Sequence, residues 1–356
     1  MSIKSVIIGT GSCIPTEVVK NEDFLGHSFL QEDGTPFKGN TANIIQKFEK
    51  ITGIKERRYA LDSQNASDLA VIAANNAIDA ANIAKDTIDY ILLAHNFGDV
   101  SKGSIQGDML PSLASKVKHK LGIQNPNCVA LDIVFGCPGW LQGMLQATSF
   151  IKSGMAKTIL VIGTETLSRV IDDFDRDSMI YADGAGATLL QAKNTTEIRG
   201  FLSHAAQTFS ENELDYLFSG KSYNKTLTSN CNYLKMQGRK IYEFALTHVS
   251  NAMKIAWDKT EYPIEKLSKI LIHQANEKMD EAIVKRFYSL YKMDMPDDCM
   301  PMCIEKLGNS SVATIPTLLD LIQNNELPPH TIEKGAVVLF ASVGAGMNIN
   351  AMVYKF

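Results

Sequence analysis

The chain has 356 residues, of which 45% are hydrophobic and 21% are charged, and its formal net charge is −4. This composition is typical of a globular protein with a large core, and it excludes a disordered or fibrous chain. The mildly acidic balance argues against broad nucleic-acid binding, because such a surface repels phosphate. Six cysteines without a secretory signal indicate reduced thiols and predict a cytoplasmic protein.

Apolar runs of strand length alternate along the chain with amphipathic stretches of helix length. Such continuous apolar strands are typical of sheets that helices cover on both faces. The uncharged stretch 335–354 could just span a bilayer, but glycines and asparagines interrupt it. We therefore expect two buried strands joined by a glycine turn there, and no membrane span. The other expected elements, in chain order, are a strand at 5–9, a helix at 67–83 with Ser67 as its N-cap, strands at 89–94 and 128–135, a helix from about Pro138, and a strand at 158–163.

A weak internal repeat is visible in the pattern of strands and turns. The stretch 88–95 resembles 267–273. Each of these strands is followed by a glycine-led turn that opens a helix, at 136–139 and at 308–311. A repeat of this kind predicts two similar α/β halves.

We place the two halves at residues 1–190 and 191–356. A site at their seam would bring Cys137, His273 and Asn309 together, because each lies where a strand meets a helix. The first half would supply the cysteine, and the second half the histidine and the asparagine.

Each of these residues has a structural interpretation beside its chemical one. Cys137 precedes Pro138 at a helix start, where the helix dipole would lower the thiol pKa, although a lone cysteine is more often a small core residue. His273 at a strand end can act as acid, base or donor, or be a structural histidine. Asn309 can donate to an oxyanion or cap a helix. The turn 343–346 can expose N–H groups for an oxyanion hole or be only a tight turn.

Four motifs stand in a fixed order: Gly-Cys-Pro-Gly at 136–139, His-Gln-Ala-Asn at 273–276, Gly-Asn-Ser-Ser-Val-Ala at 308–313 and Gly-Ala-Gly at 344–346. This set resembles the β-ketoacyl synthase III group of the thiolase-fold condensing enzymes, and the resemblance runs from residue 2 to residue 356. It implies an α/β thiolase fold with five layers, αβαβα, and two pseudo-repeated halves. It also implies an acyltransferase that uses acyl-coenzyme A or acyl carrier protein thioesters as substrates, without a cofactor or metal.

The resemblance also implies roles for the residues of the seam. Cys137 would accept the acyl group as a thioester, and its backbone N–H and that of Ala345 would form the oxyanion hole. His273 and Asn309 would hold the thioester carbonyl of the second substrate and stabilise its enolate as malonyl decarboxylates. Elongating ketosynthases have a second histidine at the position of Asn309, and thiolases have a second cysteine near the final glycine turn. Neither is present here.

The residues expected along the acyl tunnel are smaller than those of the family. Leu110 and Val343 stand where the family typically has phenylalanine, and the family residue at the position of Leu110 reaches into the partner subunit's tunnel. The segment 96–109 is longer than usual. We therefore expect acceptance of longer, branched or aryl-bearing acyl chains. The polar stretch 26–39 resembles an insertion, and we expect a surface loop.

The residues expected to bind coenzyme A or acyl carrier protein differ from the family pattern. Just before Thr-Gly-Ile, the family has an aromatic residue and an arginine that hold the adenine of coenzyme A, and these positions fall near Lys47 and Ile51. A basic patch around Lys278 would attract an acidic carrier protein, although it can equally be a solvated helix face. The residues that the resemblance assigns to coenzyme A or carrier protein are Arg169, Arg239, Asn276 and Lys278.

The function predicted from these residues is a ketosynthase III-type acyltransferase for medium, long or unusual acyl chains in lipid or secondary metabolism. One alternative is a dialkylresorcinol-forming ketosynthase that joins two acyl thioesters. Another is a non-condensing acyltransferase or thioesterase on the same fold. A silent partner subunit is disfavoured, because such a chain need not keep Cys137, His273 and Asn309. We further expect a homodimer with its contact near Leu110, and binding of acyl carrier protein.

Overall fold

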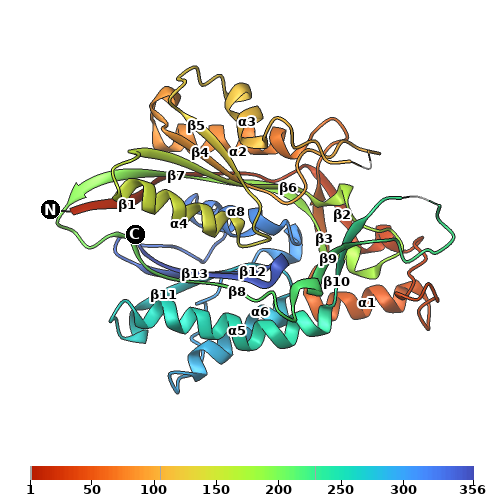
Figure 1. Cartoon of the computed structure of the whole chain (residues 1–356). Helices are drawn as coiled ribbons and strands as arrows, with labels where there is room; N and C mark the ends of the chain where they lie inside the picture. Colours follow the sequence, from red (N-terminus) through yellow and green to blue (C-terminus); the bar gives the residue numbers. More distant parts are fainter. Residues whose placement is uncertain (1, 105, 229) are drawn as a thin grey trace.

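The computed structural model describes residues 2–104, 106–228 and 230–356. Two β-sheets lie one above the other, with helices between them and helices on both outer faces (Figure 1). The five layers follow the predicted αβαβα order. Among the described residues, none of the helices combines the length and apolar character that crossing a bilayer requires.

The first sheet has the strand order β1-β7-β6-β4-β5. β4 is parallel to β5 and β6, whereas β7 is antiparallel to β1 and β6. Every residue of β6 is buried, as expected for a central strand between two helical layers. The strands are β1 (Ser2–Cys13), β4 (Tyr90–Ala94), β5 (Val129–Ile133), β6 (Thr158–Thr166) and β7 (Asp183–Thr195).

The second sheet has the strand order β11-β12-β13-β8. β11 and β12 are parallel, and the other pairs are antiparallel. β12 and β13 are buried and joined by a short turn, so the prediction of two strands within 335–354 is confirmed. The strands are β8 (Gly200–Thr208), β11 (Leu267–Ile272), β12 (Val337–Gly344) and β13 (Asn348–Lys355).

The helices are sorted by layer (Figure 1). α2 (Ala66–Ala81) and α3 (Leu113–Leu121) cover the outer face of the first sheet. α4 (Gly139–Lys152) and α8 (Thr314–Gln323) lie between the sheets. α5 (Gly238–Asp258) and α6 (Glu277–Ser289) cover the outer face of the second sheet. The remaining elements gather near one end: α1 (Thr41–Thr52), α7 (Ile304–Leu307) and the strand pairs β2 (Glu17–Lys20) with β3 (Glu56–Tyr59) and β9 (Leu217–Gly220) with β10 (Tyr233–Met236).

The middle layer holds the two sheets together. Trp140 of α4 packs against Phe340 of β12 with ring centroids 6.1 Å apart, and both side chains are buried. Leu318 of α8 joins the same cluster and is also buried. Each such side chain contributes about 1.5–3 kcal/mol through burial. Both sheets therefore share one core, and the residues at their facing strand ends are held in fixed positions.

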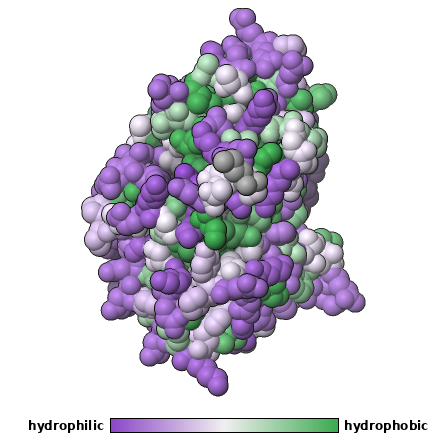
Figure 2. Space-filling model, turned by 90° about the vertical axis from the view of Figure 1, so that its left-hand side faces the viewer, coloured by the Kyte–Doolittle hydropathy of each residue, from purple (hydrophilic) through white to green (hydrophobic). Residues whose placement is uncertain are grey.

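The exterior is mixed in polarity. Figure 2 shows the face that includes the N-terminal end of Figure 1, and hydrophilic residues cover most of it around smaller hydrophobic patches. This pattern agrees with a chain in which 21% of the residues are charged.

Several boundaries differ from those predicted. Ser67 does not cap α2, which begins at Ala66 after the N-cap Asn65. The N–H and hydroxyl of Ser67 donate instead to Asp99, at 2.8 and 2.9 Å. The expected boundary between residues 190 and 191 falls inside β7, which continues to Thr195. The reason is that β7 pairs with β1 along almost its full length.

Candidate active site

A cavity of about 500 Å³ lies between the two halves, and Cys137, His273 and Asn309 all line it. Cys137 comes from the turn between β5 and α4, His273 directly follows β11, and Asn309 precedes the helical turn at Ser311–Ala313. The structure therefore brings together the three residues that the sequence places at the seam.

Cys137 lies two residues before α4, whose N-cap is Pro138. The hydroxyl of Ser311 donates a hydrogen bond to Cys137 Sγ at 3.3 Å. Burial raises the pKa of the Cys137 thiol to about 11, because a buried thiolate loses its solvation. The expectation of a lowered thiol pKa is thus wrong, because desolvation outweighs the hydrogen bonds that lower it.

Two glycines allow the cysteine turn and the final turn to touch. Gly136 has a φ of +64°, and a Cβ built on it would lie 2.6 Å from Ala345 N. A Cβ on Gly344 would lie 2.3 Å from Cys137 N. Any larger residue at either position would separate the turns. The backbone nitrogens of Cys137 and Ala345 therefore lie at one contact between the two halves, and both residues line the cavity.

His273 is buried and anchored at two points. Its N–H donates to the carbonyl of Ala341 at 2.8 Å, and its Nδ1 lies 2.7 Å from Thr314 Oγ1. Burial lowers the pKa of His273 to about 4, because the cavity does not solvate an imidazolium. The imidazole is therefore neutral at physiological pH. The single proton of the Thr314 hydroxyl has two acceptors in reach, Ser311 O at 3.0 Å and His273 Nδ1, and its donation to Nδ1 leaves the imidazole proton on Nε2.

Asn309 is held by its backbone and by its side-chain oxygen. Its N–H donates to Ile180 at 2.9 Å, and its carbonyl accepts from Ala182 at 2.9 Å. The side-chain Oδ1 accepts from the N–H of Ser311 at 2.8 Å. Because the oxygen is occupied, the amide nitrogen Nδ2 is the atom available to a ligand in the cavity. The arrangement offers a neutral donor, as an oxyanion requires.

The outer part of the cavity has mainly apolar side chains. We call this part the entrance, and it is formed by α1, by the end of the 26–39 segment, by the β9–β10 pair and by the start of α5. The expected surface loop 26–39 is therefore also part of the cavity wall. The entrance residues are Phe37, Lys38, Ile44, Lys47, Phe48, Ile51, Leu217, Leu234, Met236, Arg239, Ile241 and Tyr242.

A buried ion cluster fixes the β9–β10 pair. Lys235 Nζ lies 2.6 Å from Asp172 Oδ2 and 3.0 Å from Asp175 Oδ2, and all three side chains are buried. The ammonium also lies 3.4 Å from the ring centroid of Tyr223. Because Leu234 and Met236 flank this lysine, the cluster determines where two entrance side chains stand.

Four further predicted residues line the cavity: Val343, Ala345, Asn276 and Arg239. Asn276 is the N-cap of α6, and its Oδ1 accepts from Met279 N at 3.0 Å. The Arg239 side chain is 91% exposed and pairs with Glu243 at 2.9 Å. Lys278 is exposed at the start of α6, outside the cavity lining.

Leu110 and Arg169 do not line the cavity of their own chain. Leu110 is 90% exposed. The side chain of Arg169 is 2% exposed, and it donates to the carbonyl of Leu61 at 2.9 Å and pairs with Asp62 at 3.5 Å. Arg169 is therefore engaged within the fold, and the geometry of this chain gives no support to its expected contact with the nucleotide end.

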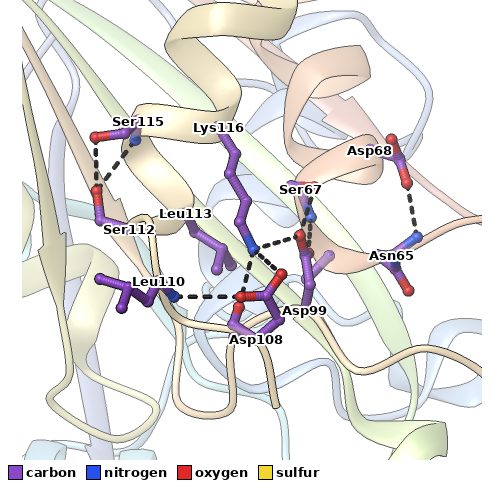
Figure 3. Close-up of polar contacts among 12 residues, drawn as sticks. Asn65, Ser67, Asp68, Asp99, Asp108, Leu110, Ser112, Leu113, Ser115 and Lys116 are labelled. Atoms are coloured by element: carbon purple, nitrogen blue, oxygen red, sulfur yellow. Dashed lines mark hydrogen bonds and ion pairs between the residues drawn. The ribbon is translucent and has the colours of Figure 1, made fainter. Parts of the chain in front are cut away.

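The long segment before Leu110 is tied to two helices. Asp99 accepts from Ser67 of α2, and Lys116 of α3 lies 3.4 Å from Asp99 Oδ2 and 2.8 Å from Asp108 Oδ2 (Figure 3). Leu110 N donates to Asp108 Oδ1 at 3.3 Å. These contacts hold the base of the segment and leave the Leu110 side chain on the surface.

Sequence reasoning missed Asn96, Ser311 and Glu165. Asn96 and Ser311 line the cavity, and buried Glu165 at the end of β6 contacts Asn96. Ser311 belongs to a motif used to identify the family, Gly-Asn-Ser-Ser-Val-Ala at 308–313. A polar residue directly after a buried strand was an available signal for Asn96. Among the described residues, no group of three or more His, Cys, Asp or Glu side chains is arranged to hold a metal ion.

Comparisons with known proteins agree with this geometry. The family model described as 3-Oxoacyl-[acyl-carrier-protein (ACP)] synthase III matches residues 131–208, and the model for its C-terminal part matches residues 257–356. The β-ketoacyl-[acyl-carrier-protein] synthase III of Novosphingobium aromaticivorans is 31% identical over all of both chains. That of Erythrobacter litoralis is 29% identical over 99% of this chain and all of its own. The crystal structure of 3-oxoacyl-[acyl-carrier-protein] synthase III from Aquifex aeolicus is 27% identical, with a TM-score of 0.80 over 99% of this chain and 100% of the other.

Proposed function

Because this chain belongs to the 3-oxoacyl-[acyl-carrier-protein] synthase III family, and is thus a thiolase-fold condensing enzyme of the acyltransferase class, we propose that Cys137 is its nucleophile and that His273 and Asn309 serve its second substrate. One observation carries the proposal: these three side chains, far apart in the sequence, line one cavity. The proposal requires neither cofactor nor metal.

In the first half-reaction, Cys137 Sγ attacks the carbonyl carbon of an acyl thioester. The backbone N–H groups of Cys137 and Ala345 stabilise the oxyanion. The carrier leaves as a thiol that takes up the proton lost by Cys137. The product is an acyl thioester on Cys137, and splitting the reaction in this way replaces one difficult step by two easier ones.

In the second half-reaction, a malonyl thioester loses carbon dioxide to give an enolate. The neutral donors His273 Nε2–H and Asn309 Nδ2 stabilise its oxygen without giving up a proton. The enolate carbon attacks the acyl carbonyl, and the new carbon–carbon bond forms. Cys137 Sγ leaves as a thiolate and takes up a proton from solvent, which restores the thiol. A His273 with a pKa lowered to about 4 is suited to this role, because it stays a neutral donor.

The acyl donor has a medium, long or branched chain. The entrance contributes apolar walls from α1 and from Leu217, Leu234 and Met236. We call the part of the cavity at Cys137, His273 and Asn309 the floor, and Val343 leaves space near it. Such walls favour apolar chains through the hydrophobic effect. A role in lipid or secondary metabolism follows from such a donor, and a cytoplasmic location stays a prediction.

The apolar entrance also favours a second candidate, the joining of two acyl thioesters as in dialkylresorcinol formation. In that reaction the second substrate would itself bring an alkyl chain, and the entrance would hold it while the first chain occupies the floor. A thioesterase would release free acid from the same Cys137 thioester without forming a carbon–carbon bond.

The partners are a second copy of the chain and an acyl carrier protein. β5 is an edge strand of the first sheet, and Met109, Leu110 and Val134 beside it are 45%, 90% and 61% exposed. A second copy would cover these side chains and bring Leu110 toward the partner's tunnel. Arg239 and Lys278, on exposed helix starts beside the cavity, would attract an acidic carrier protein.

The test is product analysis with purified protein. Acetyl, octanoyl, decanoyl and branched acyl thioesters, on coenzyme A and on carrier protein, are each combined with malonyl or acyl thioesters, and the products are identified by mass spectrometry. We expect β-ketoacyl products with octanoyl or longer donors. Strict preference for acetyl would contradict the proposed chain length, and free acid alone would contradict condensation.

A further inference from the structure

A line of hydrogen bonds leads from the buried strand β6 to the sulfur of Cys137. The Nδ2 of Asn96 donates to Glu165 Oε1 at 2.6 Å and to Ser311 Oγ at 3.2 Å. Ser311 Oγ in turn donates to Cys137 Sγ at 3.3 Å. Three elements of the first half and one turn of the second half thus meet at the nucleophile.

The proton positions along this line follow from the chemistry of the groups. A primary amide nitrogen has two protons and accepts none, so Asn96 Nδ2 can serve both Glu165 and Ser311. The hydroxyl of Ser311 then accepts from Asn96 and has its own proton for Cys137 Sγ. If the amide of Asn96 were rotated by 180°, its oxygen would face Glu165 Oε1, with no proton between them when Glu165 is ionised. Above its raised pKa of about 8, ionised Glu165 therefore selects the amide orientation that aligns Ser311.

Burial and backbone geometry show that this arrangement is specific. Glu165 and Ser311 are 1% and 5% exposed, so their polar atoms depend on protein partners. Ser311 has a φ of +53°, which is uncommon for a residue with a Cβ and tends to occur at functional sites. The same turn orients Asn309, through the bond from Ser311 N to Asn309 Oδ1.

We propose that Ser311 is a positioning residue for Cys137, and that Asn96 and Glu165 hold the Ser311 hydroxyl so that it donates to the sulfur when the thiolate forms. The inference deepens the proposed function, because it rests on Cys137 being the nucleophile. The hydrogen-bond donor to the sulfur is then Ser311, a residue outside the set Cys137, His273 and Asn309.

The balance of charges around the sulfur makes such a donor effective. Burial raises the pKa of the Cys137 thiol, and the Ser311 hydrogen bond lowers it. The charge of Glu165 raises it further once Glu165 ionises, above its own raised pKa of about 8. Tyr181, from the turn before β7, and His273 also line the cavity, and burial keeps both neutral near physiological pH. No cationic group acts on the sulfur among those that shift its pKa, so the hydroxyl is the side-chain group that favours the thiolate.

The first test measures the thiol without any acyl substrate. The rate of iodoacetamide alkylation at Cys137 is followed by peptide mass spectrometry from pH 6 to pH 10. Removing a hydrogen bond to a charged acceptor costs about tenfold or more in the equilibrium that forms the charge. We therefore expect Ser311→Ala to lower the alkylation rate at a given pH by about tenfold and to shift the profile to higher pH. Ser310→Ala, at the adjacent buried serine that does not line the cavity, is the matched control and should leave the profile unchanged.

The second test addresses the positioning line. Glu165→Gln keeps an oxygen that can accept from Asn96, whereas Glu165→Leu does not. We expect the Gln variant to alkylate at least as fast as the wild type, because it keeps the acceptor for Asn96 and, above pH 8, lacks the unfavourable charge of ionised Glu165. We expect the Leu and Asn96→Ala variants to resemble Ser311→Ala. Thermal unfolding and circular dichroism of each variant identify any that does not fold, in which case Asn96→Ala, which changes a cavity-lining residue, decides the question.

An unchanged alkylation profile in folded Ser311→Ala would overturn the inference. So would equal profiles for folded Glu165→Gln and Glu165→Leu. Neither result would affect the proposed function, which depends on acylation at Cys137. Conversely, normal acylation of a Cys137→Ala variant would overturn the proposed function, whatever the alkylation profiles show.

Discussion

The floor and the entrance of the cavity are built in opposite ways. At the floor, Cys137, His273 and Asn309 stand at strand and helix ends, and each has a hydrogen-bond partner within the fold. At the entrance, the walls come from short elements near the edge of the molecule, namely α1, the end of the 26–39 segment and the β9–β10 pair. Their side chains are mostly apolar and partly exposed, as for Ile51 at 55%.

We infer from this difference that the floor determines the reaction and the entrance determines the choice of acyl chain. The floor is fixed by two sheets that share one core, so its geometry tolerates little change. The entrance is fixed by local contacts such as the Lys235 cluster, so it can vary without disturbing the floor. We therefore expect substitutions at the floor to change the reaction, and substitutions at the entrance to change the choice of acyl chain.

The largest effect is expected at the ion cluster beneath the entrance. Lys235→Met leaves the buried carboxylates of Asp172 and Asp175 without their cation, which costs about 3–5 kcal/mol. We expect limited proteolysis to cut the 217–236 region much faster in this variant, while iodoacetamide alkylation of Cys137 stays near the wild-type rate. Lys221→Met, at an exposed lysine in the same region, is the control. If resistance to proteolysis and Cys137 alkylation were both lost in Lys235→Met, the entrance and the floor would not be structurally independent.

The next effect concerns the second half-reaction at the floor. Asn309→Ala removes a donor to the enolate, and loss of one such donor typically costs about 100- to 1,000-fold in rate. We expect condensation to slow by that factor while formation of the acyl-enzyme continues. The rate of acyl-enzyme formation is measured by intact mass after quenching the reaction at set times. The rate of condensation is measured separately from steady-state product formation. Equal loss in both would contradict the division of roles between Cys137 and Asn309.

A pH effect of intermediate size distinguishes the buried floor from the exposed entrance. Burial raises the pKa of Glu165 to about 8 from an ordinary value of 4.5. Above pH 4.5 the unfolded chain therefore releases this proton while the folded chain keeps it, so the group lowers the free energy of unfolding as pH rises toward 8.

Glu165→Gln lacks this titration. Between pH 5 and pH 7 the wild type should lose roughly 2 kcal/mol of unfolding free energy relative to the variant, since each pH unit is worth about 1.4 kcal/mol. Urea unfolding of both proteins at the two pH values measures the difference. Parallel pH dependence in wild type and variant would show that Glu165 titrates normally in the fold.

The smallest effect is expected for a single wall residue of the entrance. Leu234→Trp narrows the entrance, and we expect about a tenfold loss of kcat/KM with long-chain donors, which is typical of one poorly fitted hydrophobic contact. Acetyl donors should react unchanged. Leu227→Trp, at an exposed leucine outside the cavity lining, is the matched control. An equal loss for short and long donors would show that the entrance does not select chain length.

The sequence predicted the layers and the floor because their signals are local. Continuous apolar runs identify buried strands, and the glycine turns at 136–139 and 344–346 mark where two strand ends meet. The sequence patterns of the entrance residues were weaker predictors of their position. The polar stretch 26–39 gives no periodicity that would place Phe37 in a cavity wall, and Lys235 reads as an ordinary surface lysine until Asp172 and Asp175 are seen beside it.

The thiol pKa was mispredicted for a related reason. The helix dipole at Cys137 is visible in the sequence as a position before a helix, whereas the depth of burial that opposes it depends on the packing of both halves. Arg169 illustrates the same limit, because its pairing with the 60–62 segment follows from tertiary structure alone.

The central claim is that Cys137 receives the acyl group. Intact-protein mass spectrometry of the wild type and of Cys137→Ala, each mixed with a panel of acyl-coenzyme A and acyl-carrier-protein thioesters, tests it directly. We predict a mass increase of one acyl group in the wild type, largest with medium or long chains and absent from the variant. The same adduct on Cys137→Ala, or no adduct on the wild type with any donor, would contradict the account.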